Sequence, residues 1–267
     1  MTIQEKLQKI INVKQDLAKD LVLLCKDKKE TQKGVYFDGE VEVEPGVFFD
    51  TSEGNIFIGE KTRLRAYCVL RGPIIIGKNS KINSFAEITC SRIGDVSFIG
   101  GELYQSVVQS YSNKPHPGFV GHSYVGSWVN LGGGTNTATL KNTYGEVKVD
   151  GINTGQIQIG SIIGDYVKTA INTSIFPGKI IGPGANLYGT IIDDVPAFTS
   201  HVTPSHLYEI PVDISIKTQK AMVKRRDVEF TKEMENEIRE LFDKTQQIRD
   251  KAKVRKEKLS FMVFGEK

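Results

Sequence analysis

The sequence lacks a long apolar run. No stretch of it approaches the roughly eighteen consecutive apolar residues that a membrane-spanning helix needs. The first residues, Met1 to Lys6, contain no basic region followed by an apolar segment, so we expect no signal peptide and no membrane partner. With 39% apolar and 25% charged residues, the chain has the composition of a folded globular protein, which excludes a disordered or collagen-like chain.

Cysteine is also scarce. The three cysteines, Cys25, Cys68 and Cys90, are odd in number and far apart, which fits neither a zinc knuckle nor a disulfide framework. We therefore expect a reducing compartment, the cytosol. We also interpret Cys68 and Cys90 as small buried residues and not as nucleophiles.

A large excess of charge of either sign is absent. The 35 basic and 32 acidic residues leave a net charge of +3, too small to indicate a nucleic-acid partner. Glycine and proline are nearly missing from both ends, because 25 of the 26 glycines and all nine prolines lie between residues 31 and 216. This distribution predicts a helix in residues 1–30, a turn-rich β domain in 31–203, and a linker with a helix in 204–267.

The two ends carry helical stripes. The apolar positions of the first stripe are separated by steps of three and four, and Thr231 is placed to cap the second helix. We expect helices near residues 3–28 and 228–258, used either for oligomerisation or for packing on the chain's own β domain. The stripes comprise Ile3, Leu7, Ile10, Leu17, Leu21 and Leu24 at one end, and Met234, Ile238, Leu241, Phe242 and Ile248 at the other.

The centre repeats every six residues. A period of six fits neither a helix nor simple strand alternation, but it fits a chain that turns a corner every six residues, so that three hexads close one triangular coil. Stacked coils would pair as parallel strands around an aliphatic core, giving an all-β solenoid. The predicted inward residues include Ile58, Leu64, Leu70, Ile76, Ile82, Ile88 and Ile181. The pattern resembles the hexapeptide-repeat acyltransferases, which implies a left-handed parallel β-helix.

The repeat is interrupted at residues 101–118 and 140–156, and interruptions of a solenoid often carry its function. The segment between them, Gly121 to Asn136, contains the one tryptophan of the chain. Together with Leu140 to Gly145, it resembles the C-terminal acetyltransferase domain of the bifunctional glucosamine-1-phosphate acetyltransferase/N-acetylglucosamine-1-phosphate uridylyltransferases. Related sugar-nucleotidyltransferase-like proteins with G-H-S-Y-[LV]-G and L-K-N-x-Y-G are more similar still.

That resemblance implies the roles of several residues. His122 would be the general base that deprotonates the sugar amine, with Tyr124 and Asn130 contacting the sugar. Asn142, Tyr144 and Lys148 would lie beside the donor, acetyl-CoA. Basic side chains would hold the sugar phosphate, with Lys114 and Arg71 as first candidates and Arg65 and Arg92 as others. The resemblance implies no metal in the acyltransferase core and a homotrimer with sites between subunits.

The expected function is therefore N-acetyl transfer from acetyl-CoA to an amino-sugar phosphate. No glycine-rich phosphate loop precedes Gly34, so we do not expect nucleotidyl transfer by this chain alone. Two alternatives stay open. One is a zinc hydrase of the γ-carbonic anhydrase type, for which His116 and His122 lack a third histidine nearby. The other is a non-catalytic binding subunit that pairs with a separate nucleotidyltransferase.

Overall fold

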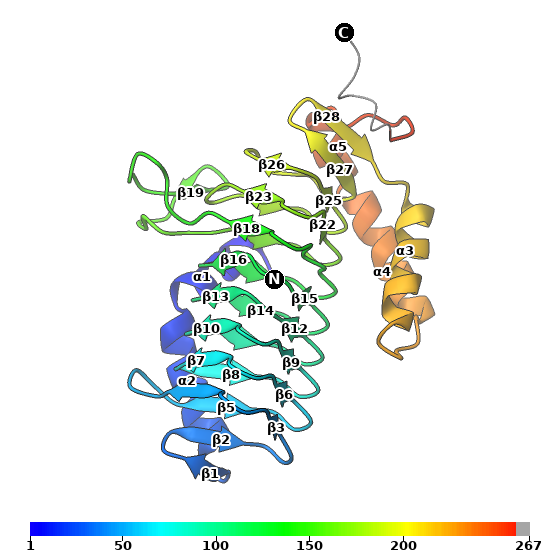
Figure 1. Cartoon of the computed structure of the whole chain (residues 1–267). Helices are drawn as coiled ribbons and strands as arrows, with labels where there is room; N and C mark the ends of the chain where they lie inside the picture. Colours follow the sequence, from blue (N-terminus) through cyan, green and yellow to red (C-terminus); the bar gives the residue numbers. More distant parts are fainter. Residues whose placement is uncertain (260–267) are drawn as a thin grey trace.

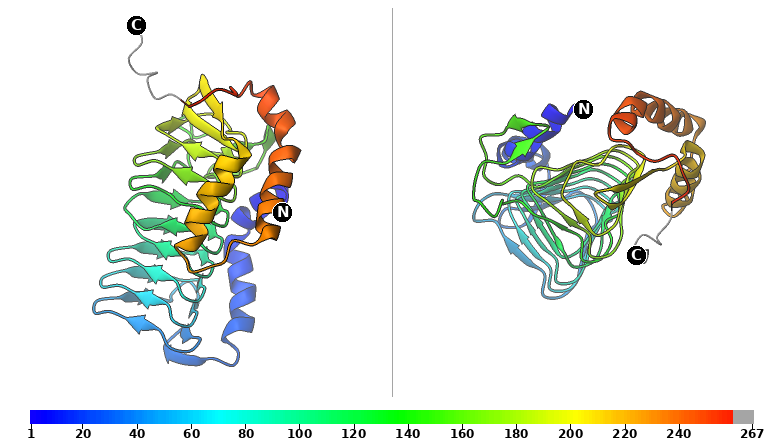
Figure 2. Two further views of the ribbon diagram at one scale, coloured as in Figure 1. Left: turned by 90° about the vertical axis from the view of Figure 1, so that its right-hand side faces the viewer. Right: turned by 90° about the horizontal axis from the view of Figure 1, so that it is seen from above.

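A computed structural model describes residues 1–259 of the chain as a triangular solenoid with helices along two of its sides (Figures 1 and 2). It is a left-handed parallel β-helix, as the six-residue period and the family resemblance predict. We name its faces A, B and C in the order in which each coil visits them. The strands of each face stack in register and hydrogen-bond to the coils above and below.

Face A begins with an antiparallel pair and continues as parallel strands: β1 (Lys29–Gln32), β2 (Val35–Phe37), β5 (Ile56–Ile58), β8 (Ile74–Ile76), β11 (Arg92–Ile93), β14 (Val107–Val108), β17 (Tyr124–Val125), β21 (Ile162–Ile163) and β24 (Ile180–Ile181). Face B holds β3 (Glu42–Val43), β6 (Arg63–Leu64), β9 (Lys81–Ile82), β12 (Phe98–Ile99), β15 (Asn113–Lys114), β22 (Lys168–Thr169), β25 (Asn186–Leu187), β27 (Thr199–Thr203) and β28 (His206–Glu209). Bridges through Asn130 join its two halves.

Face C consists of β4 (Phe48–Asp50), β7 (Val69–Arg71), β10 (Glu87–Thr89), β13 (Glu102–Tyr104), β16 (Phe119–Gly121), β18 (Asn136–Thr137), β23 (Ser174–Ile175) and β26 (Thr190–Ile191). All seven of the aliphatic residues predicted to point inward are at most 1% exposed, which confirms the six-residue period. Cys68 and Cys90 are buried free thiols, and burial raises their pKa values to about 12 and about 11. Neither is therefore a thiolate near neutral pH.

The first predicted interruption of the repeat is wrong. Residues 102–121 form β13, β14, β15 and β16, which continue all three faces without an excursion. The second interruption is real. Between β18 and β21 the chain leaves the solenoid and returns to it, forming the hairpin of β19 (Lys148–Val149) and β20 (Ile152–Asn153) on the way. We call residues 138–160 the excursion loop.

The N-terminal helices, α1 (Ile3–Ile11) and α2 (Val13–Cys25), cover face A. The first begins at a capping box, in which Thr2 and Glu5 exchange side-chain to backbone hydrogen bonds. Their buried residues, such as Leu7 and Leu17, pack against the outward side chains of face A, including Phe57. These helices therefore pack on the chain's own β domain, one of the two uses that the sequence left open.

The C-terminal helices are α3 (Val212–Lys224), α4 (Lys232–Lys244) and α5 (Gln246–Lys251). The Thr231 side chain accepts a hydrogen bond from the Met234 N–H, which confirms the predicted cap of α4. Helix α4 packs through Ile238 against Phe198 and Tyr166, and α3 lies along face B. Figure 2 shows these helices at a different side of the triangle from the N-terminal pair, and face C without a helix. Among residues 1–259 no helix is long and apolar enough to span a membrane.

Candidate functional site

His122 lies at the corner where face C meets face A. Its backbone is left-handed, with φ 43°, and its N–H donates to the carbonyl of Tyr104 at 2.9 Å. Cys90 and Gln105 adopt the same conformation at this corner in the coils below, so the backbone strain belongs to the corner and not to the histidine alone. The fold thus directs the His122 side chain outward along the C–A edge.

The imidazole of His122 is partly buried. Its ring lies 5.4 Å from the Tyr104 ring, and within residues 1–259 it makes no hydrogen bond. Burial lowers the pKa of this imidazole below its ordinary value of 6.5, because the charged form loses water. At neutral pH the ring is therefore uncharged and has a nitrogen lone pair available for a proton.

The excursion loop leaves and rejoins the solenoid directly above His122. The Gly160 N–H donates to the His122 carbonyl at 2.9 Å, and the Ile159 N–H donates to the Thr139 carbonyl at 3.0 Å. Val147, Val149 and Ile159 belong to the same apolar cluster as α1 and α2, and Figure 2 shows the loop beside these helices. The base of the loop is therefore held in place, next to the histidine.

The three residues predicted to contact the donor all lie on the excursion loop. Asn142 and Lys148 are exposed, and the Tyr144 side chain is 73% exposed. Lys141 steadies the turn by donating from its ammonium to the Glu146 carbonyl at 2.7 Å. The three candidates therefore share the excursion loop, whose base lies next to His122, and their side chains are open to solvent.

Tyr124, unlike the exposed residues of the excursion loop, is buried. It is 2% exposed, packs in the apolar cluster under the N-terminal helices, and has the Lys6 ammonium 5.2 Å from its ring centroid. Its side chain points outward from face A, but α1 covers that face. A sugar contact by Tyr124 is therefore incompatible with this position of α1, which corrects the expectation taken from the motif.

The expected phosphate contact by Lys114 also differs from what the structure shows. Lys114 occupies an inward position of β15, above Ile99, and is 5% exposed. Its ammonium donates to the carbonyls of Gly100 at 2.7 Å, Gly118 at 2.6 Å and His116 at 3.3 Å. Burial lowers its pKa to about 8. The three carbonyls use all three N–H donors of the ammonium, so Lys114 stabilises the B–C corner and does not face a phosphate.

The arginine candidates for phosphate binding already have carboxylate partners. Arg71 lies 3.2 Å from Glu87, Arg65 lies 3.3 Å from Glu44, and Arg92 pairs with Asp20 of α2. Arg71 is also three strands below Gly121 on face C. At about 4.8 Å per strand, this puts it about 14 Å below the His122 corner.

Asn130 lies on a different side of the solenoid from His122. It is exposed on face B, beyond the A–B corner, where it lines a groove of about 260 Å³ between the coils and α3. The whole width of face A, strand β17 included, separates this groove from the C–A corner. A single chain therefore does not bring His122 and Asn130 together.

The groove contains residues that sequence analysis did not identify as a site. Trp128 stacks on Tyr111 with ring centroids 4.2 Å apart and planes 7° apart. Lys168 lies beside this stack, and Arg225 and Arg226 approach from the end of α3. Lys168 is one coil above Asn130 on face B. The solenoid register alone could have predicted that pair, but not the position of α3.

The possible metal ligands of the described residues do not form a cluster. Within the part of the chain that the structure describes, no three His, Cys, Asp or Glu side chains are grouped so that they could hold a metal ion. His116 is exposed at the B–C corner and His122 lies at the C–A corner, on opposite sides of face C.

Comparison with known proteins gives sequence relatives that include bifunctional enzymes. The chain is 38% identical over 97 residues to the bifunctional sugar-1-phosphate nucleotidylyltransferase/acetyltransferase of Sulfurisphaera tokodaii, a match covering 34% of this chain and 24% of that protein. It is 28% identical over 198 residues to the bifunctional protein GlmU of a Janthinobacterium species, covering 72% of this chain and 40% of that protein. The chain thus spans between a quarter and two fifths of these curated relatives. No family model matches it.

Structural comparison matches this chain to a UDP-N-acetylglucosamine acyltransferase of Francisella novicida. The identity is 16%, the TM-score is 0.38, and the match covers 82% of this chain and 87% of that one. Another match is the N-acyltransferase AntD of Bacillus cereus in complex with dTDP and coenzyme A, with 15% identity, a TM-score of 0.30, and coverage of 74% and 98%. The sequence matches agree with the resemblance stated above: this chain is similar in sequence to part of the bifunctional nucleotidyltransferase/acetyltransferase proteins.

Proposed function

We propose that this chain transfers an acetyl group from acetyl-CoA to the amine of an amino-sugar phosphate, with glucosamine-1-phosphate as the first substrate to test. The observation that carries the proposal is the His122 imidazole, uncharged through burial, free of hydrogen bonds within residues 1–259, and placed beneath the excursion loop. Relatives whose names include an acetyltransferase activity support the choice of reaction.

The proposed step needs no covalent enzyme intermediate. The sugar amine attacks the thioester carbonyl carbon while His122 accepts the proton that the amine loses. The carbon–sulfur bond breaks, and the coenzyme A thiolate takes up a proton as it leaves, so an amide and a free thiol are formed. A positioned base contributes about 10²- to 10⁴-fold to such a step.

The excursion loop is the proposed donor side of the site. Asn142 and Tyr144 would contact the acyl donor, and Lys148 would offer a positive charge to its phosphates. Their exposure and their place on a loop whose base hydrogen-bonds to the His122 carbonyl support this assignment. Arg71 would have to exchange Glu87 for a ligand phosphate, which makes it the weakest of the proposed binding residues.

We further propose that the site is completed between copies of the chain in a homotrimer. His122 and Asn130 lie on different sides of one solenoid, so a second copy has to supply one of them. Face C is the side without a helix and carries exposed apolar side chains, including Phe48, Phe176 and Ile192, which are between 42% and 57% exposed. Such a surface suits association around a threefold axis.

The test of the reaction is release of free coenzyme A thiol. Wild-type protein should release thiol from acetyl-CoA when glucosamine-1-phosphate is present, and should release much less with glucosamine, which lacks the phosphate. Mass spectrometry of the sugar product should show one added acetyl group. Absence of turnover on every amino-sugar phosphate tried would overturn the proposal and favour the binding-subunit alternative.

A further inference from the structure

The groove between face B and α3 concentrates positive charge without a counter-ion. Its walls bring together Lys168 from the coils and Arg225 and Arg226 from the end of α3. Within residues 1–259, none of the three forms an ion pair with a carboxylate. The arginines of the lower coils behave differently, since Arg63, Arg65 and Arg71 each pair with a glutamate.

Neutral hydrogen bonds hold two of these cations in place. The Lys168 ammonium donates to the Gln219 side chain at 2.9 Å and to the Tyr166 carbonyl at 3.1 Å. The Arg226 guanidinium donates to the Asn113 side chain and lies 4.2 Å from the centroid of the Phe98 ring. The groove is therefore built from positioned donors and not from freely moving surface lysines.

Burial disfavours the charged forms of Lys168 and Arg226 as long as no anion lies in the groove. Loss of water lowers the pKa of Lys168 to about 8, and burial with the neighbouring Arg225 charge lowers the pKa of Arg226. The end of a helix favours basic residues by itself, which accounts for Arg225. It does not account for Lys168, which lies on β22 and is not part of the helix.

We propose that this groove binds the phosphate of a small phosphorylated ligand. Lys168 and Arg226 would donate charge-assisted hydrogen bonds to the phosphate oxygens, and the amides of Asn113 and Asn130 would contact the adjoining part of the ligand. A cavity of about 260 Å³ accommodates a sugar phosphate or one phosphorylated end of a larger molecule such as coenzyme A. Only Asn130 is shared with the acetyltransferase site proposed above, so the inference does not require acetyl transfer.

The chain provides its own reporter for this site. Trp128 is the one tryptophan in the sequence, and it lines the groove. Binding of inorganic phosphate, glucosamine-1-phosphate and coenzyme A would be measured by isothermal titration calorimetry, with Trp128 emission locating the bound molecule. We expect saturable binding of at least one of the three, accompanied by a change in Trp128 emission.

Charge-removing variants test the assignment. Arg226→Gln and Lys168→Gln should each weaken binding about tenfold or more, because a hydrogen bond to a charged group is lost. Arg225→Gln, at an exposed position, should weaken it by a smaller factor. Lys224→Gln is the matched control, since it removes one charge from the same helix outside the groove and should leave the affinity unchanged.

The outcomes are separable from those of the acetyl-transfer assay. Stronger binding of glucosamine-1-phosphate than of phosphate identifies a sugar phosphate as the ligand, and stronger binding of coenzyme A identifies the acyl donor. No heat of binding with any of the three, or equal weakening by Lys224→Gln, would overturn the proposal. Binding in the groove by a chain without acetyltransferase activity would leave the inference standing and reject the proposed reaction.

Discussion

At the scale of single residues, His122 has a left-handed backbone, and the shape of the solenoid corner accounts for it. Its left-handed conformation is the one that this corner requires in successive coils, as Cys90 and Gln105 show. What distinguishes it is a partly buried ring that has no hydrogen-bond partner within residues 1–259. Abstraction of a proton from an amine requires a neutral imidazole whose nitrogen lone pair accepts no hydrogen bond from the protein.

The pH dependence of turnover follows from this burial. Because burial lowers the pKa of His122, the proposed base stays unprotonated to a lower pH than a solvated histidine would. The acidic limb of kcat/KM should therefore have its midpoint below 6.5, with activity falling as the pH falls through it. A pH–rate profile of the wild-type protein checks this, and a midpoint at or above 6.5 would contradict it.

Lys114 should matter for stability. Lys114→Ala removes the donors of three carbonyls at the B–C corner and leaves a cavity in the core. We expect the free energy of unfolding to fall by about 2–4 kcal/mol, measured by urea denaturation. Lys78→Ala, at an exposed position, is the control and should change it by less than about 0.5 kcal/mol. Equal stability of both variants would contradict the structural role.

The inward orientation of Lys114 could have been predicted from the sequence. It lies six residues after Val108 and six before Val120, both of which are buried, so it is in phase with the core. The family motif drew attention to its charge, and the charge suggested a ligand. Tyr124 is different, because no local pattern indicates that α1 covers its ring.

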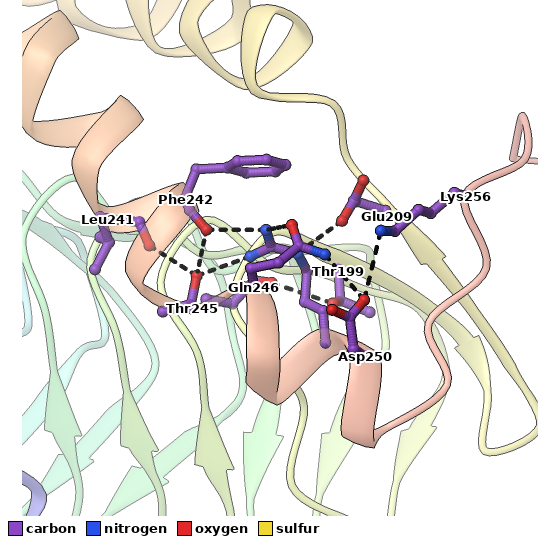
Figure 3. A network of polar contacts seen from close by, with 10 residues as sticks. Thr199, Glu209, Leu241, Phe242, Thr245, Gln246, Asp250 and Lys256 are labelled. Carbon is purple, nitrogen blue, oxygen red and sulfur yellow. Dashed lines mark hydrogen bonds and ion pairs between the residues drawn. The ribbon is translucent and has the colours of Figure 1, made fainter.

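At the scale of elements, the C-terminal helices are attached by a buried charge. Arg249 of α5 is fully buried, with its guanidinium 2.8 Å from the Glu209 carboxylate of β28 and 3.9 Å from the Phe242 ring centroid. Figure 3 shows Glu209, Phe242, Thr245 and Gln246 converging from β28, α4 and α5. Removing one member of a buried pair usually costs about 3–5 kcal/mol, because the other charge is left without a partner.

Arg249→Met should therefore release α4 and α5 from the end of the solenoid. Hydrogen exchange should show loss of amide protection in these two helices, while the coils below keep theirs. Arg239→Met is the matched control. The Arg239 side chain is 42% exposed and pairs with Asp213 and Glu235, and its loss should cost at most about 1 kcal/mol. Unchanged protection of α4 and α5 in Arg249→Met would show that the pair does not hold them.

The helical stripes predicted α4 and its cap at Thr231 but not α3. Residues 212–224 have a weak apolar stripe, because Ser215 and Gln219 take two of the buried positions. They are buried against face B, where Gln219 accepts a hydrogen bond from Lys168. A helix that packs through polar side chains gives little periodic signal, and its partner surface is not readable from the sequence.

At the scale of the whole molecule, the period of six was enough to predict the solenoid, since it fixes which residues point inward. The same period places His122 and Asn130 on different sides, because each hexad forms one face of a coil. They are eight positions apart in the sequence, but the corner at Trp128 intervenes. The family resemblance implies sites between subunits, and the structure places His122 and Asn130 at two different edges of the triangle within one chain.

If the site is shared between copies as proposed, inactive variants should complement one another. Homotrimers of His122→Ala and of Asn130→Ala should each be weakly active, whereas trimers reassembled from a mixture of both should recover activity, because some interfaces then combine two intact edges. Light scattering should give a trimer mass for every sample. A monomeric protein, or no recovery on mixing, would contradict a site shared between copies.

The central claim is that His122 is the base, and one kinetic measurement tests it most directly. His122→Ala should lower kcat for acetyl transfer to glucosamine-1-phosphate by about 10²-fold or more, while its melting temperature and oligomeric mass match the wild type. The control His206→Ala, at a partly exposed histidine of β28, should keep its kcat. Full turnover by His122→Ala would remove His122 from the mechanism.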